Sequence, residues 1–361
     1  MARILVLTNM YPSKKYPHYG VFVLNTVELL KQDGHQVKVI SKPKNDSKVV
    51  RLMNYVFFYI QGIISSLFGH YDYVYGHYIS HISYMVKIIH QLKPKIKIVL
   101  NAHGNDVVIE EDWMYKNEQR SAMVLPLAER IIVPSEYFKK VMIEQYQIKE
   151  DKIVLYPSGG VNLSVIHKKD PVEAKKALKL DSDTSYLGYV SRIEAHKGWE
   201  IFVKMAQLLK EQGDSRKFIM VGTGDQEKEL TQLITACNLE KEIIRIPFIS
   251  QAELSNVYSA LEYLVFPTYR KSESLGLVGL EAMACETIMI AANNYGPTSY
   301  IQDGQNGYFF ESRNVLDLVC KINMIDALSN EEKQRIQRAA FATAKTYETN
   351  ATAPIIKHVF K

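Results

Sequence analysis

The stretch YRKSESLGLVGLEAMACE, residues 269–286, decides the fold that the rest of this chain is expected to adopt. It follows LEYLVFPT, residues 261–268, an apolar run that reads as a buried strand ending at Pro267. A Ser-Leu-Gly turn and a helix of small residues, 277–285, come next. This order of strand, loop and helix places the loop at the carboxyl end of a sheet, where α/β folds bind ligands.

Two glutamates, Glu273 and Glu281, stand in this stretch with seven residues between them. The backbone N–H groups of Leu275, Gly276 and Leu277 open the helix, so they lack partners within it and favour an anion. A carboxylate on either side of an anion site suits a ligand with hydroxyl groups flanking a diphosphate, which is the layout of a sugar nucleotide. The alternative is that both glutamates are solvated surface residues, because this spacing alone often arises by chance.

In its setting of strand, turn and small-residue helix, the stretch resembles the E-x7-E signature of retaining glycosyltransferases of family 4. Those enzymes have the GT-B architecture, which consists of two Rossmann-like domains. The resemblance implies that Glu273 holds hydroxyls of the donor sugar and that Glu281 holds the ribose hydroxyls. It also implies donor contacts from the residues after Glu273, which are Ser274, Leu275, Gly276 and Leu277. Ser274 stands where the family usually has glycine.

Two cations, Arg192 and Lys197, follow an expected strand within residues 184–200. Arginine can bind a diphosphate through two parallel hydrogen bonds, and lysine can bind it as a point charge. As isolated surface charges the two residues would carry no meaning. The segment resembles the Gly-Arg-Leu…Lys-Gly signature of the same family, which implies that both residues bind the donor phosphates. Ser191 replaces the glycine that usually precedes the arginine.

The first half of the chain contributes three further candidates. Gly20 lies between an expected strand at residues 2–8 and a helix, and its lack of a Cβ would let a phosphate approach the backbone. His103 and Asp106 follow an expected strand in residues 95–106. By resemblance, His103 lies beside the anomeric centre and Asp106 near the acceptor. Each has a structural alternative, as a turn glycine, a satisfied histidine or a loop aspartate.

Composition limits the class of protein. A length of 361 residues suits two domains. Three cysteines without a CxxC motif argue against a disulfide framework or a zinc site, and favour a reducing compartment. The Gly-Thr-Gly of residues 222–224 has no third glycine, which disfavours NAD. The net charge of +5 is concentrated in residues 1–165, so an anionic partner is expected, although no nucleic-acid-binding motif is present.

Residues 52–68, LMNYVFFYIQGIISSLF, form the longest apolar run. It is marginal for a membrane span and lies inside a series of alternating strands and helices, so we expect a helix packed on the sheet. The alternative is a helix with one face among lipid headgroups. The basic residues before it favour such a surface contact: Lys42, Lys44, Lys48 and Arg51.

Together these features predict an α/β protein of GT-B type, with two Rossmann-like domains whose parallel sheets face an interdomain cleft. Residues 1–165 are expected on the acceptor side, with a last helix near 347–361 packing back onto them, and residues 166–346 are expected to bind the nucleotide sugar. By resemblance, the reaction transfers a hexosyl group, from a UDP-sugar by preference, with retained configuration.

No DxD motif lies at the end of an expected strand, and no set of His, Cys or Asp residues has metal-ligand spacing, so we expect a metal-independent enzyme without a cofactor. The expected acceptor is a glycan or lipid-linked saccharide of bacterial surface polysaccharide synthesis. The expected location is the cytoplasm, at the inner face of the membrane. Two alternatives remain open: a GT-B epimerase of sugar nucleotides, and a non-catalytic subunit that binds sugar nucleotides for a partner transferase.

Overall fold

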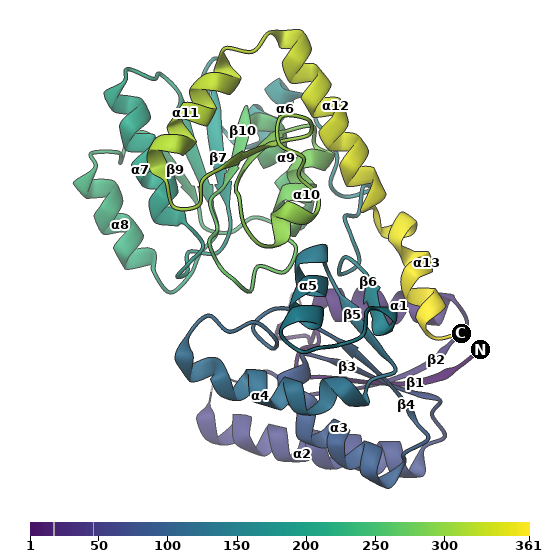
Figure 1. The fold of residues 1–361 in the computed structure, drawn as a ribbon. Coiled ribbons are helices and arrows are strands. Elements are labelled where there is room, and N and C mark those ends of the chain that lie inside the picture. Colours follow the sequence, from purple (N-terminus) through teal and green to yellow (C-terminus); the bar gives the residue numbers. More distant parts are fainter. Residues whose placement is uncertain (17–18, 46) are drawn as a thin grey trace. The chain divides into compact units, whose positions relative to one another are not determined.

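The computed structural model describes residues 1–16, 19–45 and 47–361, and the chain divides into two compact units. The first unit comprises Met1–Gly159 with Thr352–Lys361, and the second comprises Gly160–Ala351. Each unit contains one six-stranded sheet, and all the strand pairs in both sheets are parallel (Figure 1). The predicted α/β class with two Rossmann-like domains is therefore confirmed. The chain passes between units at Gly159–Gly160, a few residues before the boundary expected near residue 165.

The sheet of the first unit has the order β2-β1-β3-β4-β5-β6. Alternate residues of a strand face opposite sides of a sheet, and β1 shows this: Ile4 and Val6 pack in one apolar cluster, and Leu5 and Leu7 in another. Both faces are therefore buried, which explains the nearly continuous apolar strands. The strands are β1 (Arg3–Thr8), β2 (Gln36–Ser41), β3 (Tyr73–His77), β4 (Lys97–Asn101), β5 (Arg130–Val133) and β6 (Ile153–Leu155).

Helices cover both faces of this sheet. One face packs against α2 (Lys48–Phe68), α3 (Ile79–Leu92), α4 (Tyr115–Val124) and α5 (Glu136–Glu144). The other face packs against α1 (Val21–Gln32) and α13 (Thr349–Val359). After α13, the ring of Phe360 lies 5.2 Å from the ring of Tyr73 and 5.1 Å from that of Tyr75. Single-turn helices occur at Asp112–Met114, Leu125–Leu127 and Glu150–Lys152.

The second unit also contains one six-stranded sheet, with the strand order β12-β11-β10-β7-β8-β9. Its strands are β7 (Tyr186–Val190), β8 (Lys217–Val221), β9 (Ile243–Ile246), β10 (Tyr263–Phe266), β11 (Ile288–Ala292) and β12 (Tyr308–Phe310). One face packs against α7 (Trp199–Glu211), α8 (Glu227–Ala236) and α11 (Val315–Asp326). On the other side lie α6 (Pro171–Ala177), α9 (Gln251–Ala260), α10 (Leu277–Ala284), α12 (Asn330–Thr346) and a short turn of helix at Gly296–Ser299.

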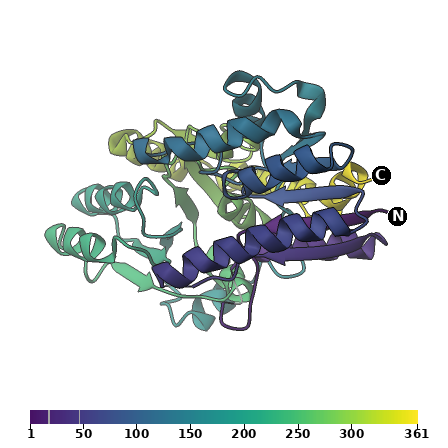
Figure 2. The ribbon, with the colours of Figure 1, turned by 90° about the horizontal axis from the view of Figure 1, so that it is seen from below.

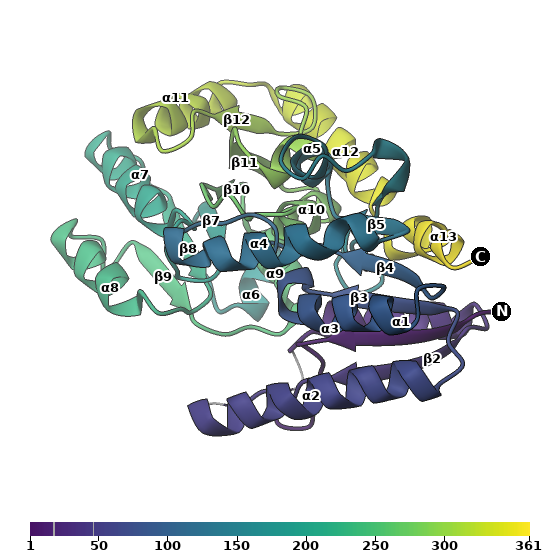
Figure 3. The same cartoon turned by 60° about the horizontal axis from the view of Figure 1, so that its bottom comes forward.

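The long apolar helix α2 packs on the sheet as expected, but through one side only. It begins at Lys48, and only Phe58, Gly62 and Ser66 are buried, while most of its apolar side chains are exposed. Figures 2 and 3 show α2 (purple-blue) running along the outside of the first unit. None of the helices described here has the length and apolar character needed to cross a bilayer.

Candidate functional site

The loop between β10 and α10 is held in place by the segment that follows β11. Gly276 begins the helix with a φ of 80°, a left-handed conformation that favours glycine, and its carbonyl accepts a hydrogen bond from the Tyr300 hydroxyl at 2.9 Å. Gly296 donates its N–H to the carbonyl of Glu273 at 3.1 Å. A Cβ on Gly296 would lie 2.6 Å from the backbone nitrogen of Leu275, so only glycine permits this approach. The loop is therefore fixed by its neighbours.

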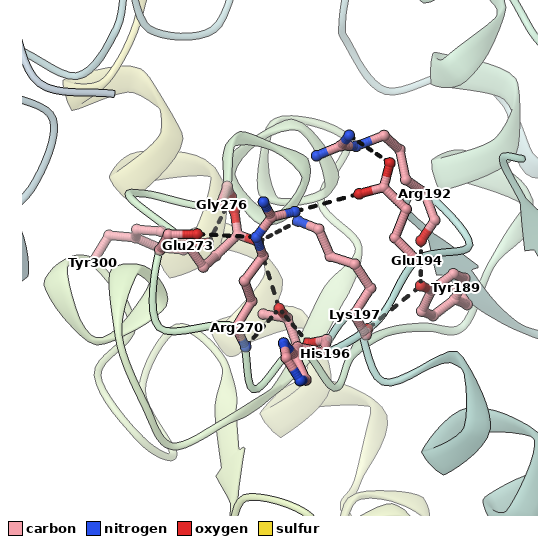
Figure 4. Close-up of polar contacts among 11 residues, drawn as sticks. Tyr189, Arg192, Glu194, His196, Lys197, Arg270, Glu273, Gly276 and Tyr300 are labelled. Atoms are coloured by element: carbon pink, nitrogen blue, oxygen red, sulfur yellow. Dashed lines mark hydrogen bonds and ion pairs between the residues drawn. The ribbon is translucent and has the colours of Figure 1, made fainter. Parts of the chain in front are cut away.

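Lys197 and Glu273, which come from separate loops, form a direct ion pair in this site. The Lys197 Nζ lies 2.6 Å from Glu273 Oε2, and the two side chains are only 10% and 13% exposed (Figure 4). Burial raises the pKa of Glu273, but the charge and hydrogen bond of Lys197, with the charges of Arg270 and Arg192, outweigh it, so the pKa of this carboxyl is lowered from its usual value. The carboxylate is therefore charged at neutral pH.

Local contacts bring the loop after β7 against the end of β10. Gly198 begins α7 with a φ of 75°, and a Cβ there would lie 2.1 Å from the carbonyl oxygen of Pro267. The Tyr189 hydroxyl lies 3.1 Å from the carbonyl oxygen of Arg192 and 3.4 Å from that of Lys197, close enough to donate to either (Figure 4). The close packing at Gly198 and the contacts of this tyrosine explain how Lys197 reaches the loop that carries Glu273.

Arg192 lies at the exposed end of the same network. Its Nη1 is 2.6 Å from Glu194 Oε1, and its side chain is 61% exposed. The other oxygen of Glu194 lies 3.4 Å from Nη1 of Arg270, whose Nε donates to the Ser272 hydroxyl at 3.0 Å (Figure 4). Glu194 and Arg270 were missed by the sequence analysis. Their charge and their position beside Arg192 and Glu273 were the available signals.

The second glutamate, Glu281, points into the second unit and not into bulk solvent. Its Oε2 accepts a hydrogen bond from the Tyr258 hydroxyl at 2.8 Å. Burial raises the pKa of Glu281 from its usual value, and the hydrogen bond from Tyr258 offsets only part of that rise. Tyr258 on α9 was also missed, because nothing in the sequence relates an α9 tyrosine to α10.

Between the two glutamates lies the start of α10. Within the described part of the chain, the backbone N–H groups of Leu275, Gly276 and Leu277 make no hydrogen bond. These free donors, together with the helix dipole, give the loop a positive potential. Lys197 adds a full positive charge close by. The second unit therefore combines anion-binding groups with two carboxylates that can accept hydrogen bonds from hydroxyls.

In the first unit, His103 follows β4 and packs among aromatic rings. Its ring centroid lies 4.8 Å from those of Tyr78 and Phe22. Its Nε2 is 2.9 Å from Nδ1 of His77, the last residue of β3, and the two rings are stacked. Burial lowers the pKa of His103 to about 3, so the ring is neutral. His77 was missed by the sequence analysis, although it ends the strand that pairs with β4.

The environment of His77 indicates which nitrogens carry the protons. His77 is fully buried, and its Nε2 has no partner among the described residues. A buried N–H without an acceptor costs more than an unused lone pair, so we infer that the proton of His77 is on Nδ1. Nδ1 then donates to Nε2 of His103, which leaves His103 protonated on its own Nδ1.

Asp106 fixes the loop that carries His103. Its Oδ1 accepts from the backbone N–H groups of His103 at 3.1 Å and Gly104 at 2.8 Å, and its Oδ2 accepts from that of Ile79 at 3.0 Å. The carboxylate is buried, and burial raises its pKa, an effect that the backbone hydrogen bonds partly offset. These contacts give Asp106 a positional role, and its expected place near an acceptor stays a prediction.

The local backbone requires glycine at position 20. Its φ is 82°, and a Cβ there would lie 2.7 Å from the carbonyl carbon and oxygen of Met10. The close approach that was expected from a phosphate is thus already made by the Met10 carbonyl group. A donor contact at Gly20 stays a prediction.

The predicted site residues fall into two sets. Lys197 and Glu273 are in contact, with Arg192 linked to them through Glu194 and Arg270, and Glu281 follows on α10, all in the second unit. Gly20, His103 and Asp106 belong to the first unit. Within the described ranges, no group of three or more His, Cys, Asp or Glu residues is placed to hold a metal ion.

Family comparisons match both units. A model described as "Glycosyltransferase Family 4" matches residues 19–162, and one described as "Glycosyl transferases group 1" matches residues 172–342. The two matches cover most of the chain, and they follow the order of the two units.

Among curated proteins, the chain is similar to D-inositol 3-phosphate glycosyltransferases. That of Pseudarthrobacter chlorophenolicus is 26% identical over 303 residues, which cover 80% of this chain and 70% of the relative. That of Mycobacterium marinum is 25% identical over 300 residues, which cover 79% of this chain and 62% of the relative.

Among solved structures, the chain is similar to sucrose-phosphate synthase from Thermosynechococcus elongatus, with a TM-score of 0.81 and 18% identity, covering 100% of this chain and 98% of that one. It is also similar to Anabaena Alr3699/HepE in complex with UDP and glucose, with a TM-score of 0.77 and 17% identity, covering 99% of each chain. At this identity, these similarities concern the fold.

Proposed function

This chain belongs to glycosyltransferase family 4 and is a transferase of GT-B type, and we propose that it moves a hexosyl group from a UDP-sugar to a lipid-linked saccharide with retained configuration. The observation that carries the proposal is the Lys197–Glu273 ion pair beside the unpaired N–H groups at the start of α10. The cation and the N–H groups can bind a diphosphate, and the carboxylate can accept hydrogen bonds from sugar hydroxyls.

The proposed donor site uses each charged group in one role. Lys197, Arg192 and the N–H groups of residues 275–277 bind the diphosphate. Glu273 accepts hydrogen bonds from hydroxyls of the transferred sugar, and Ser274 lies beside it. Glu281, held by Tyr258, accepts hydrogen bonds from the ribose. Because Lys197 and Glu273 are already paired, the donor meets groups in a fixed arrangement, and little reorganisation is needed.

The proposed reaction needs no covalent intermediate on the protein. The bond between the anomeric carbon and the β-phosphate oxygen breaks, and the acceptor oxygen attacks that carbon from the same face. The acceptor proton passes to the departing phosphate. Lys197, Arg192 and the start of α10 balance the growing charge on the leaving group without a metal ion. A role of His103 beside the anomeric centre stays a prediction; its neutral ring would add no positive charge where positive charge develops.

Two observations support the proposed substrates. A protein of the same fold has been solved with UDP and glucose, which favours a uridine donor. The concentration of positive charge in residues 1–165 favours an acceptor at an anionic membrane face, as in bacterial capsule, exopolysaccharide or O-antigen assembly. The names of the relatives indicate a different acceptor, inositol 3-phosphate, so this polyol belongs in any acceptor screen.

The test begins with thermal shifts of the purified protein against UDP-, GDP- and ADP-sugars, followed by turnover with lipid-linked saccharides and inositol 3-phosphate. Glu273→Gln keeps the size of the side chain and removes its charge, so it should abolish transfer while donor binding persists. Glu286→Gln is the matched control, because Glu286 pairs with Lys168 at the same 2.6 Å in the same unit. Full activity of Glu273→Gln would refute the assignment.

The products separate the remaining alternatives. A transferase yields free nucleoside diphosphate and an extended acceptor, and NMR of the new linkage reports its anomeric configuration. An epimerase would convert one sugar nucleotide to another without an acceptor. A non-catalytic subunit would bind the donor calorimetrically and turn over none of the acceptors.

A further inference from the structure

The exposed side of α2 carries a stripe of large apolar side chains. Leu52, Val56, Ile60, Ile64 and Phe68 recur every four residues, a spacing that places neighbours on one face of a helix. All five are exposed, from 47% for Ile60 to 81% for Phe68. We call them the α2 stripe. A surface helix normally keeps polar residues on its outer face, so a stripe of this kind indicates a surface that another phase or molecule covers.

The opposite side of α2 is already committed to the first unit. Phe58, Gly62 and Ser66 are buried there at the same spacing. A Cβ on Gly62 would lie 2.1 Å from the Met85 sulfur, so glycine lets α2 pack closely on α3. Because the inner side holds the helix in place, the outer stripe is not explained by the packing of the unit itself.

The charges around the stripe favour an anionic lipid surface over a protein. Neither α2 nor α3 contains an aspartate or glutamate. Lys44, Lys48 and Arg51 are exposed at the amino-terminal end of α2. Basic residues beside an apolar face are what an interfacial helix presents to anionic headgroups. A symmetric pairing of two copies through this face would bring these like charges together.

A groove beside the stripe combines mostly aromatic and apolar walls with one cation, which suits a lipid chain and its phosphate. It has a volume of about 530 Å³ and lies between α2, α3 and α4, with walls from Tyr55, Tyr59, Ile60 and Tyr84. The phenol of Tyr55 lies 2.8 Å from Nδ1 of His81, and burial lowers the pKa of that histidine to about 4, so His81 is neutral. Among the described residues that line the groove, only Arg120 carries a full charge, and its guanidinium lies 5.8 Å from the Tyr84 ring centroid.

We propose that the α2 stripe and this groove form a surface by which the first unit docks on an anionic lipid bilayer. The helix, roughly 30 Å long from its 21 residues, lies in the plane of the interface. The stripe contacts acyl chains, Lys44, Lys48 and Arg51 contact headgroups, and the groove receives one lipid chain with its phosphate at Arg120. This docking deepens the proposed function, because it would bring the enzyme to a lipid-linked acceptor.

The first experiment measures sedimentation of the whole protein with vesicles of phosphatidylcholine alone, or with a third of phosphatidylglycerol. Binding should be about tenfold or more tighter to the anionic vesicles, and 0.5 M NaCl should weaken it. The variant Leu52→Gln/Ile60→Gln/Ile64→Gln should lose binding to both kinds of vesicle. Lys48→Ser/Arg51→Ser should lose only the preference for phosphatidylglycerol. Equal binding by wild type and all variants would overturn the proposal.

A matched control comes from exposed apolar side chains of the second unit. Val172→Gln/Leu316→Gln/Met324→Gln replaces residues of similar exposure and should leave vesicle binding unchanged. Unchanged melting temperatures and donor-induced thermal shifts in all variants would show that the fold and the donor site survive. Vesicle binding does not depend on turnover, so the docking can hold or fail independently of the proposed reaction.

Two further measurements address the groove and the rival occupant. A short-chain phosphatidylglycerol, below its micelle concentration, should bind about tenfold more weakly to Arg120→Gln. Inorganic phosphate alone should not compete; if it does, the groove is a phosphate site and not a lipid site. A wild-type dimer in sedimentation that the stripe variant dissociates, without vesicle binding, would assign the stripe to a second copy and refute the lipid proposal.

Discussion

Both units have a six-stranded parallel sheet, yet the ends of their strands differ in chemistry. In the second unit, the loops after β7 and β10 meet in buried and half-buried ion pairs, with Lys197 on Glu273 and Glu194 on Arg270. In the first unit, the loops after β3 and β4 meet in two neutral histidines, His77 and His103. In the proposed reaction, the charged groups suit the diphosphate, and the neutral histidines would add no positive charge beside a centre that becomes positive.

The largest expected effect comes from removing Lys197 from its ion pair with Glu273. Lys197→Met leaves a buried carboxylate without its partner, so the free energy of unfolding should fall by about 3 kcal/mol or more, as seen when buried pairs lose one member. Denaturant unfolding measures this loss. The double variant Lys197→Met/Glu273→Gln should recover part of the stability but no transfer activity. Equal stability of Lys197→Met and wild type would contradict a buried pair.

The same pair predicts a pH dependence confined to the second unit's site. The folded pKa of Glu273 lies below its unfolded value, so the pair contributes stability above the ordinary carboxyl pKa, and this contribution is lost as pH falls through the folded value. Melting temperatures of wild type and Glu273→Gln should therefore converge on acidification below about pH 4.5. A gap that widens in acid would reverse the sign of the argument.

Gly198 tests whether close packing of loops positions the charges. Gly198→Ala forces a Cβ against the Pro267 carbonyl in a left-handed conformation, so it should cost about 2 kcal/mol or more and weaken donor binding. Gly213→Ala is the control, because Gly213 has a φ of 85° but open space around its Cβ. Gly213→Ala should lower the free energy of unfolding only by the conformational cost, about 1 kcal/mol, and leave donor affinity unchanged.

His77 sharpens the comparison from the side of the first unit. His77→Phe removes the donor to Nε2 of His103, so kcat should fall about tenfold to a hundredfold, and the affinity for the sugar nucleotide should not change. His77→Asn places an amide nitrogen near the position of Nδ1 and should restore part of the rate. Nitrogen chemical shifts of His103 would report the change of tautomer, which a purely structural effect would not produce.

Tyr258 gives the smallest expected effect. Tyr258→Phe removes one hydrogen bond from Glu281, which should cost about 1 kcal/mol of stability and weaken nucleoside diphosphate binding severalfold. Calorimetry with UDP would detect the change. Tyr186→Phe serves as the control, because the Tyr186 hydroxyl contacts residue 181 and not the site.

The sequence predicted the parallel sheets because these depend on local order, and the roles of the proposed site residues stay predictions. The succession of strand, turn and helix in residues 261–285 is typical of an α/β unit, and the apolar runs identified the parallel strands. The sequence did not predict the side chains that contact the site residues. Glu194, Arg270, Tyr258 and His77 became visible only when loops from different strands met.

Two features of the structure could not be read from the sequence pattern alone. An apolar run reads alike whether its helix is buried all round or on one side only. The sequence therefore predicted that α2 packs on the sheet, but not that its outer face is exposed. A glycine before a helix also reads alike whether a ligand or its own chain approaches it. At Gly20 the close neighbour is the Met10 carbonyl group.

The return of the chain's last residues to the first unit has a consequence for synthesis. Ile356 and Phe360 complete the apolar cluster that also holds Ile4, Val6 and Tyr75. A ribosome delivers them only after the whole second unit has emerged, so the second unit can close while the first still exposes part of its core. Chaperone demand during translation should therefore fall on residues 1–159, and fragments that stop before α13 should aggregate when expressed alone.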